Sequence, residues 1–64
     1  MKLDREKVDI AMARKCMTVT DLAENYGVSR NRMNVILNSQ KITPLCAGRI
    51  AKALGTDVIE ILAD

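Results

Sequence analysis

The sequence has 64 residues and a formal net charge of +2. This length is sufficient for one small domain, which we place at residues 1–64. Apolar residues make up 48% of the chain but Tyr26 is the only aromatic one, so the core must be built from aliphatic side chains, Met and Ala, and this favours helices over strands. No apolar run is long enough to span a bilayer and the first residues are charged, so we expect a cytoplasmic protein without a membrane span or a secretory signal.

Helix start and stop signals divide the chain into five short segments. The first predicted helix begins at about Asp4, a possible N-cap, and ends at about Lys15. Thr18 stands three residues before Asp21, the spacing of a helix cap, so a second helix begins there and ends at Gly27, which can adopt the left-handed conformation of a tight turn. The residues predicted to face inward from these two helices are Val8, Ala11, Met12, Cys16, Leu22, Ala23 and Tyr26.

A third helix is predicted from the N-cap Ser29 to about Asn38. Apolar residues at helical spacing define its inner face, and they are Met33, Ile36 and Leu37. The stretch from Asp21 to Leu37 therefore indicates a helix, a short turn containing glycine, and a second helix.

The fourth predicted helix begins at Thr43 and Pro44, an N-cap followed by a proline where its missing amide costs nothing, and it ends at Gly55. A fifth is predicted because Asp57 precedes Glu60 by three residues. Their inner residues are predicted to be Leu45, Ala47, Ile50, Ala51 and Leu54 in the fourth helix, and Val58, Ile61 and Leu62 in the fifth. We therefore expect an all-α, compact five-helix domain.

The basic residues are concentrated in the middle of the sequence. Residues 1–28 hold five basic and five acidic side chains, whereas residues 29–54 hold five basic side chains and no acidic one. The final segment, 55–64, holds three acidic side chains. A positive excess confined to one segment indicates an anionic partner more strongly than the net charge does.

The third predicted helix carries an unusual set of side chains on its outer side. At 100° per residue, Asn31, Val35 and Asn38 point outward, Arg32 and Asn34 lie on the flanks, and Arg30 is in the first turn. Arginine can donate two hydrogen bonds to guanine, asparagine can pair with adenine, and valine can contact a thymine methyl group. Alternatively, the asparagines are ordinary surface residues of a short helix.

Contacts to phosphates need only positive charge or amide donors. Around the third helix these are available from Lys41, Asn38, Ser39 and the helix N-terminus at Thr18. The residues thus predict double-stranded DNA as the partner, with base contacts from the helix and backbone contacts around it.

The sequence resembles the lambda-repressor-like helix-turn-helix family, the phage Cro and repressor type also called Xre-like. The resemblance covers about residues 8–62 and is carried mainly by "DLAENYGVS" and "RIAKALG". It implies that the third helix enters the major groove, with base contacts from Arg30, Asn31 and Val35. It places Arg32 and Asn34 at the groove edge, and we include Asn34 among the base contacts and Arg32 among the backbone contacts. Residues 38–41 would follow the DNA backbone.

Three positions depart from the pattern of the family. Val19 replaces a glutamine that grips a phosphate in many relatives, so one backbone anchor is missing. Met12 and Leu37 occupy positions where phage repressors often have an arginine and a glutamate, so an apolar contact replaces an ion pair. Cys16 stands where glycine is common, and a positive φ there would strain it mildly.

An enzyme is poorly supported by the sequence. It has no histidine, no glycine-rich phosphate loop and no activated nucleophile, and Cys16 and Cys46 are too far apart in sequence for a redox pair. We expect both cysteines to be buried or half-buried small apolar residues, with no metal, no cofactor and no small-molecule substrate.

These features predict a sequence-specific regulator of transcription, of the repressor type found in phages, mobile elements or bacteria, which acts by occupying an operator. One module reads only a few base pairs, so we expect a homodimer on DNA, with Ile59 as the candidate dimer contact. The alternative is a protein-interaction module such as an antitoxin or an anti-repressor.

Overall fold

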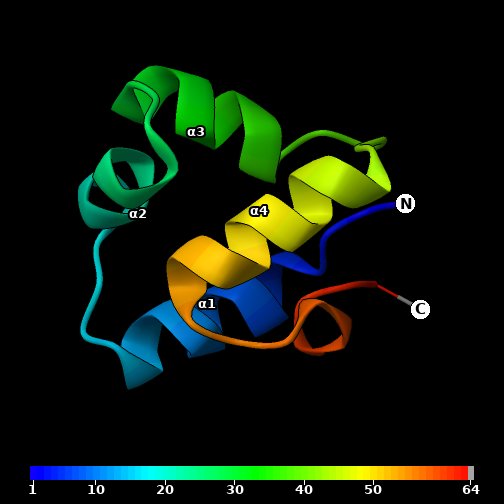
Figure 1. Cartoon of the computed structure of the whole chain (residues 1–64), viewed down its shortest axis with the longest axis horizontal. Helices are drawn as coiled ribbons and strands as arrows, with labels where there is room; N and C mark the ends of the chain where they lie inside the picture. Colours follow the sequence, from blue (N-terminus) through cyan, green and yellow to red (C-terminus); the bar gives the residue numbers. More distant parts are fainter. Residues whose placement is uncertain (64) are drawn as a thin grey trace.

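The computed structural model describes residues 1–63. This part of the chain contains four α-helices and one 3-10 turn, which are α1 (Arg5–Arg14), α2 (Val19–Tyr26), α3 (Arg30–Leu37), α4 (Pro44–Leu54) and η1 (Val58–Glu60) (Figure 1). The all-helical class is confirmed for the described residues. None of their helices combines the length and the apolar character needed to cross a membrane.

The predicted caps are present at the helix starts. The Asp4 carboxylate accepts hydrogen bonds from the amides of Glu6 and Lys7, and Thr18 and Asp21 form a reciprocal capping box. The hydroxyls of Ser29 and Thr43 cap α3 and α4 by accepting from the amides of Arg32 and Cys46, without a reciprocal bond. Each cap satisfies amides that the helix itself leaves without acceptors, which explains why the helices begin at these residues.

The predicted fifth helix is wrong in length, although its cap is correct. Asp57 and Glu60 form the expected capping box, but only the single turn η1 follows. The backbone groups that a longer helix would use are bonded to the N-terminal segment instead: Ile61 accepts from the Asp4 amide at 2.9 Å and the Ala63 amide donates to Lys2 at 2.9 Å. Leu3 and Leu62 thereby form an isolated antiparallel bridge, a feature that we did not predict.

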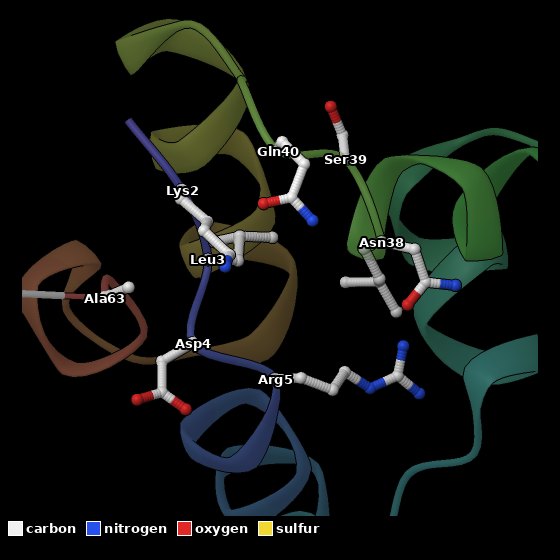
Figure 2. A pocket seen from close by; sticks show the side chains of 9 residues that line it. Lys2, Leu3, Asp4, Arg5, Asn38, Ser39, Gln40 and Ala63 are labelled. Carbon is white, nitrogen blue, oxygen red and sulfur yellow. The ribbon is translucent and has the colours of Figure 1, made fainter.

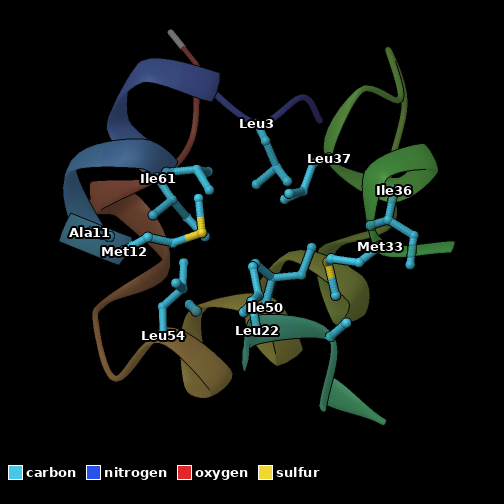
Figure 3. Packing of buried hydrophobic residues seen from close by; sticks show 13 residues of the cluster. Leu3, Ala11, Met12, Leu22, Met33, Ile36, Leu37, Ile50, Leu54 and Ile61 are labelled. Atoms are coloured by element: carbon cyan, nitrogen blue, oxygen red, sulfur yellow. The ribbon is translucent and has the colours of Figure 1, made fainter. Parts of the chain in front are cut away.

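The core lies where α1, α2, α3, α4 and the residues after η1 meet (Figure 3). The buried apolar side chains that make up this cluster are Leu3, Val8, Ala11, Met12, Leu22, Ala23, Met33, Ile36, Leu37, Ile50, Ala51, Leu54 and Ile61. Ala47 is buried as well. Met12 and Leu37 are thus both core residues, as an apolar replacement of an ion pair requires. Tyr26, Val58 and Leu62 pack against the cluster and are only partly buried.

Two predicted inner residues are exposed. Leu45 is 73% exposed, because it lies two positions before the buried Ala47 and a rotation of about 200° places it on the opposite face of α4. Cys16 is also exposed, because α1 ends at Arg14 and Cys16 adopts a left-handed conformation with φ of +52°. The position thus has the positive φ that would strain a cysteine mildly, while the expected burial of Cys16 is wrong. Cys46 is half-buried as expected, and both thiols are free.

Candidate nucleic-acid interface

The turn between α2 and α3 sets the orientation of α3. Gly27 ends α2 with φ of +96°, a conformation that strains other residues, and its amide and that of Val28 both donate to the Ala23 carbonyl. The Ser29 hydroxyl then accepts from the Arg32 amide at 3.1 Å and starts α3. In Figure 1, α2 and α3 lie together at one end of the molecule, and α3 forms its edge.

The inner and outer faces of α3 are those expected from the sequence. Met33, Ile36 and Leu37 are buried, which fixes the rotation of the helix about its axis. The predicted base contacts Arg30, Asn31 and Val35 are exposed, Val35 by 59%, whereas Asn34 is half-buried. No carboxylate occurs in α3, so its outer face offers hydrogen-bond donors and acceptors without negative charge. Such a face suits base edges.

The predicted backbone contacts surround this face. Arg32, Asn38 and Lys41 are exposed, Ser39 is half-buried, and Thr18 is exposed at the start of α2. Between α3 and the loop after it lies a hollow of about 280 Å³, lined among others by Arg32, Val35 and Lys41. Arg32 and Lys41 thus place two positive charges at this hollow, which lies beside the outer face of α3. Such charges favour a phosphate near the hollow.

Ser39 holds Lys41 in place. Its hydroxyl donates to the Lys41 carbonyl at 2.7 Å and accepts from the Lys41 amide at 3.3 Å, while its own amide donates to the Ile36 carbonyl. The predicted phosphate contact of Ser39 therefore requires its hydroxyl hydrogen to leave the Lys41 carbonyl. In the present arrangement Ser39 is a positioning residue for Lys41.

The N-terminus of α2 is already occupied by a carboxylate of the protein itself. The Thr18 amide donates to the Asp21 carboxylate at 2.9 Å, and the Thr18 hydroxyl accepts from the Asp21 amide, so the carboxylate already occupies this helix end. Val19 packs against the core and adds no polar group. What Thr18 retains for a phosphate is the hydrogen of its hydroxyl group.

A contact that we did not predict joins α2 to α4. The Arg49 guanidinium lies 4.8 Å from the centre of the Tyr26 ring, a cation–π distance. The Tyr26 hydroxyl forms a hydrogen bond of 3.5 Å with the Cys46 thiol. This bond, and secondarily burial, raises the pKa of Tyr26, while the positive charges of Arg49 and Arg32 act in the opposite direction. No local motif pairs Tyr26 with Cys46 or Arg49, because Tyr26 lies 20 or more positions from both.

The part of the chain that the structure describes contains no cluster of metal-binding side chains. No group of three His, Cys, Asp or Glu side chains there is placed to hold a metal ion. The predicted dimer contact, Ile59, is 72% exposed in η1.

A family model for Cro/C1-type helix-turn-helix DNA-binding domains matches residues 7–64. The chain belongs to this family, and it is therefore a DNA-binding regulator whose partner is double-stranded DNA. Searches among curated proteins and among solved structures gave no match.

Proposed function

We propose that the protein is a sequence-specific regulator of transcription of the repressor type, from a phage, a mobile element or a bacterium, that reads the major groove with residues 29–38. The observation that carries this proposal is the outer face of α3, where exposed Arg30, Asn31 and Val35 stand without any neighbouring carboxylate in the helix. Base contacts come from these three residues and from the half-buried Asn34.

Backbone contacts come from Arg32, Asn38 and Lys41, with Thr18 at the start of α2. Ser39 acts through Lys41, whose main chain it holds with two hydrogen bonds. The protein binds an operator as a homodimer through a surface that includes Ile59, because one module of this size reads too few base pairs for a unique site. It blocks or assists polymerase by occupying that operator in the cytoplasm.

The experiment that tests this function is selection of bound sites from a random duplex pool. The expected result is a two-fold symmetric consensus whose half-sites are about 34 Å apart, one turn of DNA. A bound pool with no consensus would contradict sequence-specific reading.

A second candidate function is a protein-interaction module such as an antitoxin or an anti-repressor. The support for it is the exposure of the apolar side chains Leu45 and Ile59, which a protein partner would cover. Titration of random duplex DNA at low salt separates the two functions. Binding that weakens as salt rises supports the regulator, and absence of binding supports the interaction module.

A further inference from the structure

A second hollow lies at the other end of the predicted interface, where the N-terminal segment passes the end of α3 (Figure 2). It measures about 320 Å³, and its polar lining includes Lys2, Arg5, Asn38 and Gln40. Figure 2 shows the ends of these four side chains around the same opening. Two cations and two amides from distant parts of the sequence thus meet beside the C-terminus of the recognition helix.

The positive charge of this hollow is only partly neutralised. Asp9 accepts from Arg5 through Nε alone, at 3.1 Å, and no described residue accepts from the two terminal nitrogens of Arg5. In Figure 2 one of these nitrogens points toward Asn38. Asp4 also lines the hollow, but its carboxylate accepts from two amides of α1 and points away from Arg5. Among the described residues the hollow therefore offers these donors without a competing carboxylate.

The backbone around the hollow is held in place before any ligand arrives. The amide of Ile42 donates to the Met1 carbonyl at 2.8 Å, and the amide of Ala63 donates to the Lys2 carbonyl at 2.9 Å. Lys2 therefore extends from a segment that is tied on both sides, and Arg5 stands in the first turn of α1. A site whose backbone is already ordered loses less entropy when it binds.

We propose that this hollow, which we call the Lys2–Arg5 cleft, binds one phosphate of the DNA backbone. The assignment rests on the proposed function, because Asn38 and Ser39 of the cleft belong to the segment that follows the DNA backbone when α3 enters the groove. A guanidinium fork, an ammonium and amide donors match the oxygens of a phosphate. The cleft extends the contact with DNA from the recognition helix to the N-terminal segment.

The test compares salt dependence of binding among variants on a random duplex and on a selected site. Arg5→Ala and Lys2→Ala should each lower the slope of log affinity against log salt on both duplexes alike. Because the cleft holds one phosphate, the double variant should lower the slope by about 0.9 per protomer in total. Arg14→Ala is the matched control, because Arg14 is in the same helix, is 69% exposed and lies 4.0 Å from Glu60 outside the cleft. It should leave the slope unchanged, and Arg5→Lys should retain most of it.

One further variant and one further ligand make the outcome decisive. The variant Arg5→Ala with Asp9→Asn should keep the lowered slope, which shows that the released Asp9 charge is not the cause. If the wild-type protein binds DNA and the slopes of Arg5→Ala and Lys2→Ala equal its own, the phosphate site is overturned and the proposed function stands. If the wild-type protein binds no duplex at low salt, both proposals are overturned. Stabilisation of the fold by inorganic phosphate, together with an unchanged DNA slope, would assign the cleft to a free anion and overturn this proposal.

Discussion

The hydroxyl of Tyr26 lies 3.5 Å from the thiol of Cys46, so the last residue of α2 is bonded to the first turn of α4. Arg49 covers the same ring from the next turn of α4. Since α2 carries α3 through a turn of three residues, this contact helps to hold the recognition helix on the rest of the domain. Because the contact raises the pKa of Tyr26, it also makes the stability of the fold depend on pH.

Tyr26 should titrate above its ordinary pKa of about 10, because its hydroxyl is bonded to Cys46 in the folded state. The folded protein then holds the phenol proton more tightly than the unfolded chain. The resulting stabilisation is fully present below about pH 10 and is lost as the pH rises through the folded-state pKa. The absorbance of tyrosinate measures this directly, because Tyr26 is the only tyrosine and there is no tryptophan.

The control for this titration is Cys46→Ala, which removes the hydrogen bond and should move the midpoint back toward the value found in denaturant. A wild-type midpoint equal to that of the denatured chain would show that the contact between Tyr26 and Cys46 has no energetic weight in solution.

Replacement of Gly27 should destabilise the domain through the backbone alone. A Cβ atom at Gly27 would meet nothing within 4 Å, but φ is +96°. Gly27→Ala should therefore cost about 1 to 2 kcal/mol, and the β-branched Gly27→Val more. Denaturant unfolding of both variants measures these losses.

Gly48 provides the matched control, because its Cβ would also meet no atom but its backbone is helical. Gly48→Ala should stabilise the domain, by up to about 1 kcal/mol. If Gly27→Ala and Gly48→Ala changed the free energy of unfolding by the same amount, the left-handed turn would not be what requires glycine at position 27.

The sequence predicted the helix starts well because each depends on residues close together in the chain. Asp4, Thr18, Ser29 and Thr43 each satisfy amides two or three residues ahead, and such spacing can be read without knowledge of the fold. The outward face of α3 follows equally from its helical period.

The errors arose where residues distant in sequence decide the structure. Leu3 and Leu62 pair across the whole chain, and no local pattern announces that pairing, so η1 was predicted as a longer helix. Lys2 and Arg5 line a hollow with Asn38 because the N-terminal segment is also bonded to the loop after α3, through the Ile42 amide and the Met1 carbonyl. No local pattern predicts this contact either, so the Lys2–Arg5 cleft was missed. The apolar character of Leu45 suggested burial, but its position in the helical rotation decided against it.

Ile59→Asp should abolish a dimer on DNA while leaving the monomer folded, because Ile59 is 72% exposed and an exposed substitution changes stability little. The expected result is loss of the two-protomer complex on a palindromic site and weaker binding to it. Measurement of complex stoichiometry by sedimentation on the duplex checks both.

Leu45→Asp serves as the comparison, since Leu45 is 73% exposed on α4. If Leu45→Asp removed the second protomer and Ile59→Asp did not, the dimer surface would lie at the start of α4. Unchanged stoichiometry in both variants would exclude both positions.

Replacing Asn31 and replacing Lys41 should have different kinds of effect on DNA binding. Asn31 is exposed on the outer face of α3, whereas Lys41 lies in the following loop. Asn31→Ala should cost about 1 to 3 kcal/mol on the selected site, much less on random DNA, and relax the preference at one base pair of each half-site. Lys41→Ala should weaken binding to both duplexes equally and lower the salt slope by about 0.9 per protomer.

Binding isotherms of both variants on both duplexes at several salt concentrations separate these effects. Ser39→Ala adds a third case, because removal of its hydroxyl releases the Lys41 main chain without removing the charge. It should weaken binding to both duplexes while leaving the salt slope nearly unchanged. Should Asn31→Ala lower specific and random binding equally, α3 would be gripping DNA without reading it, and the asparagines of its outer face would have no role in sequence recognition.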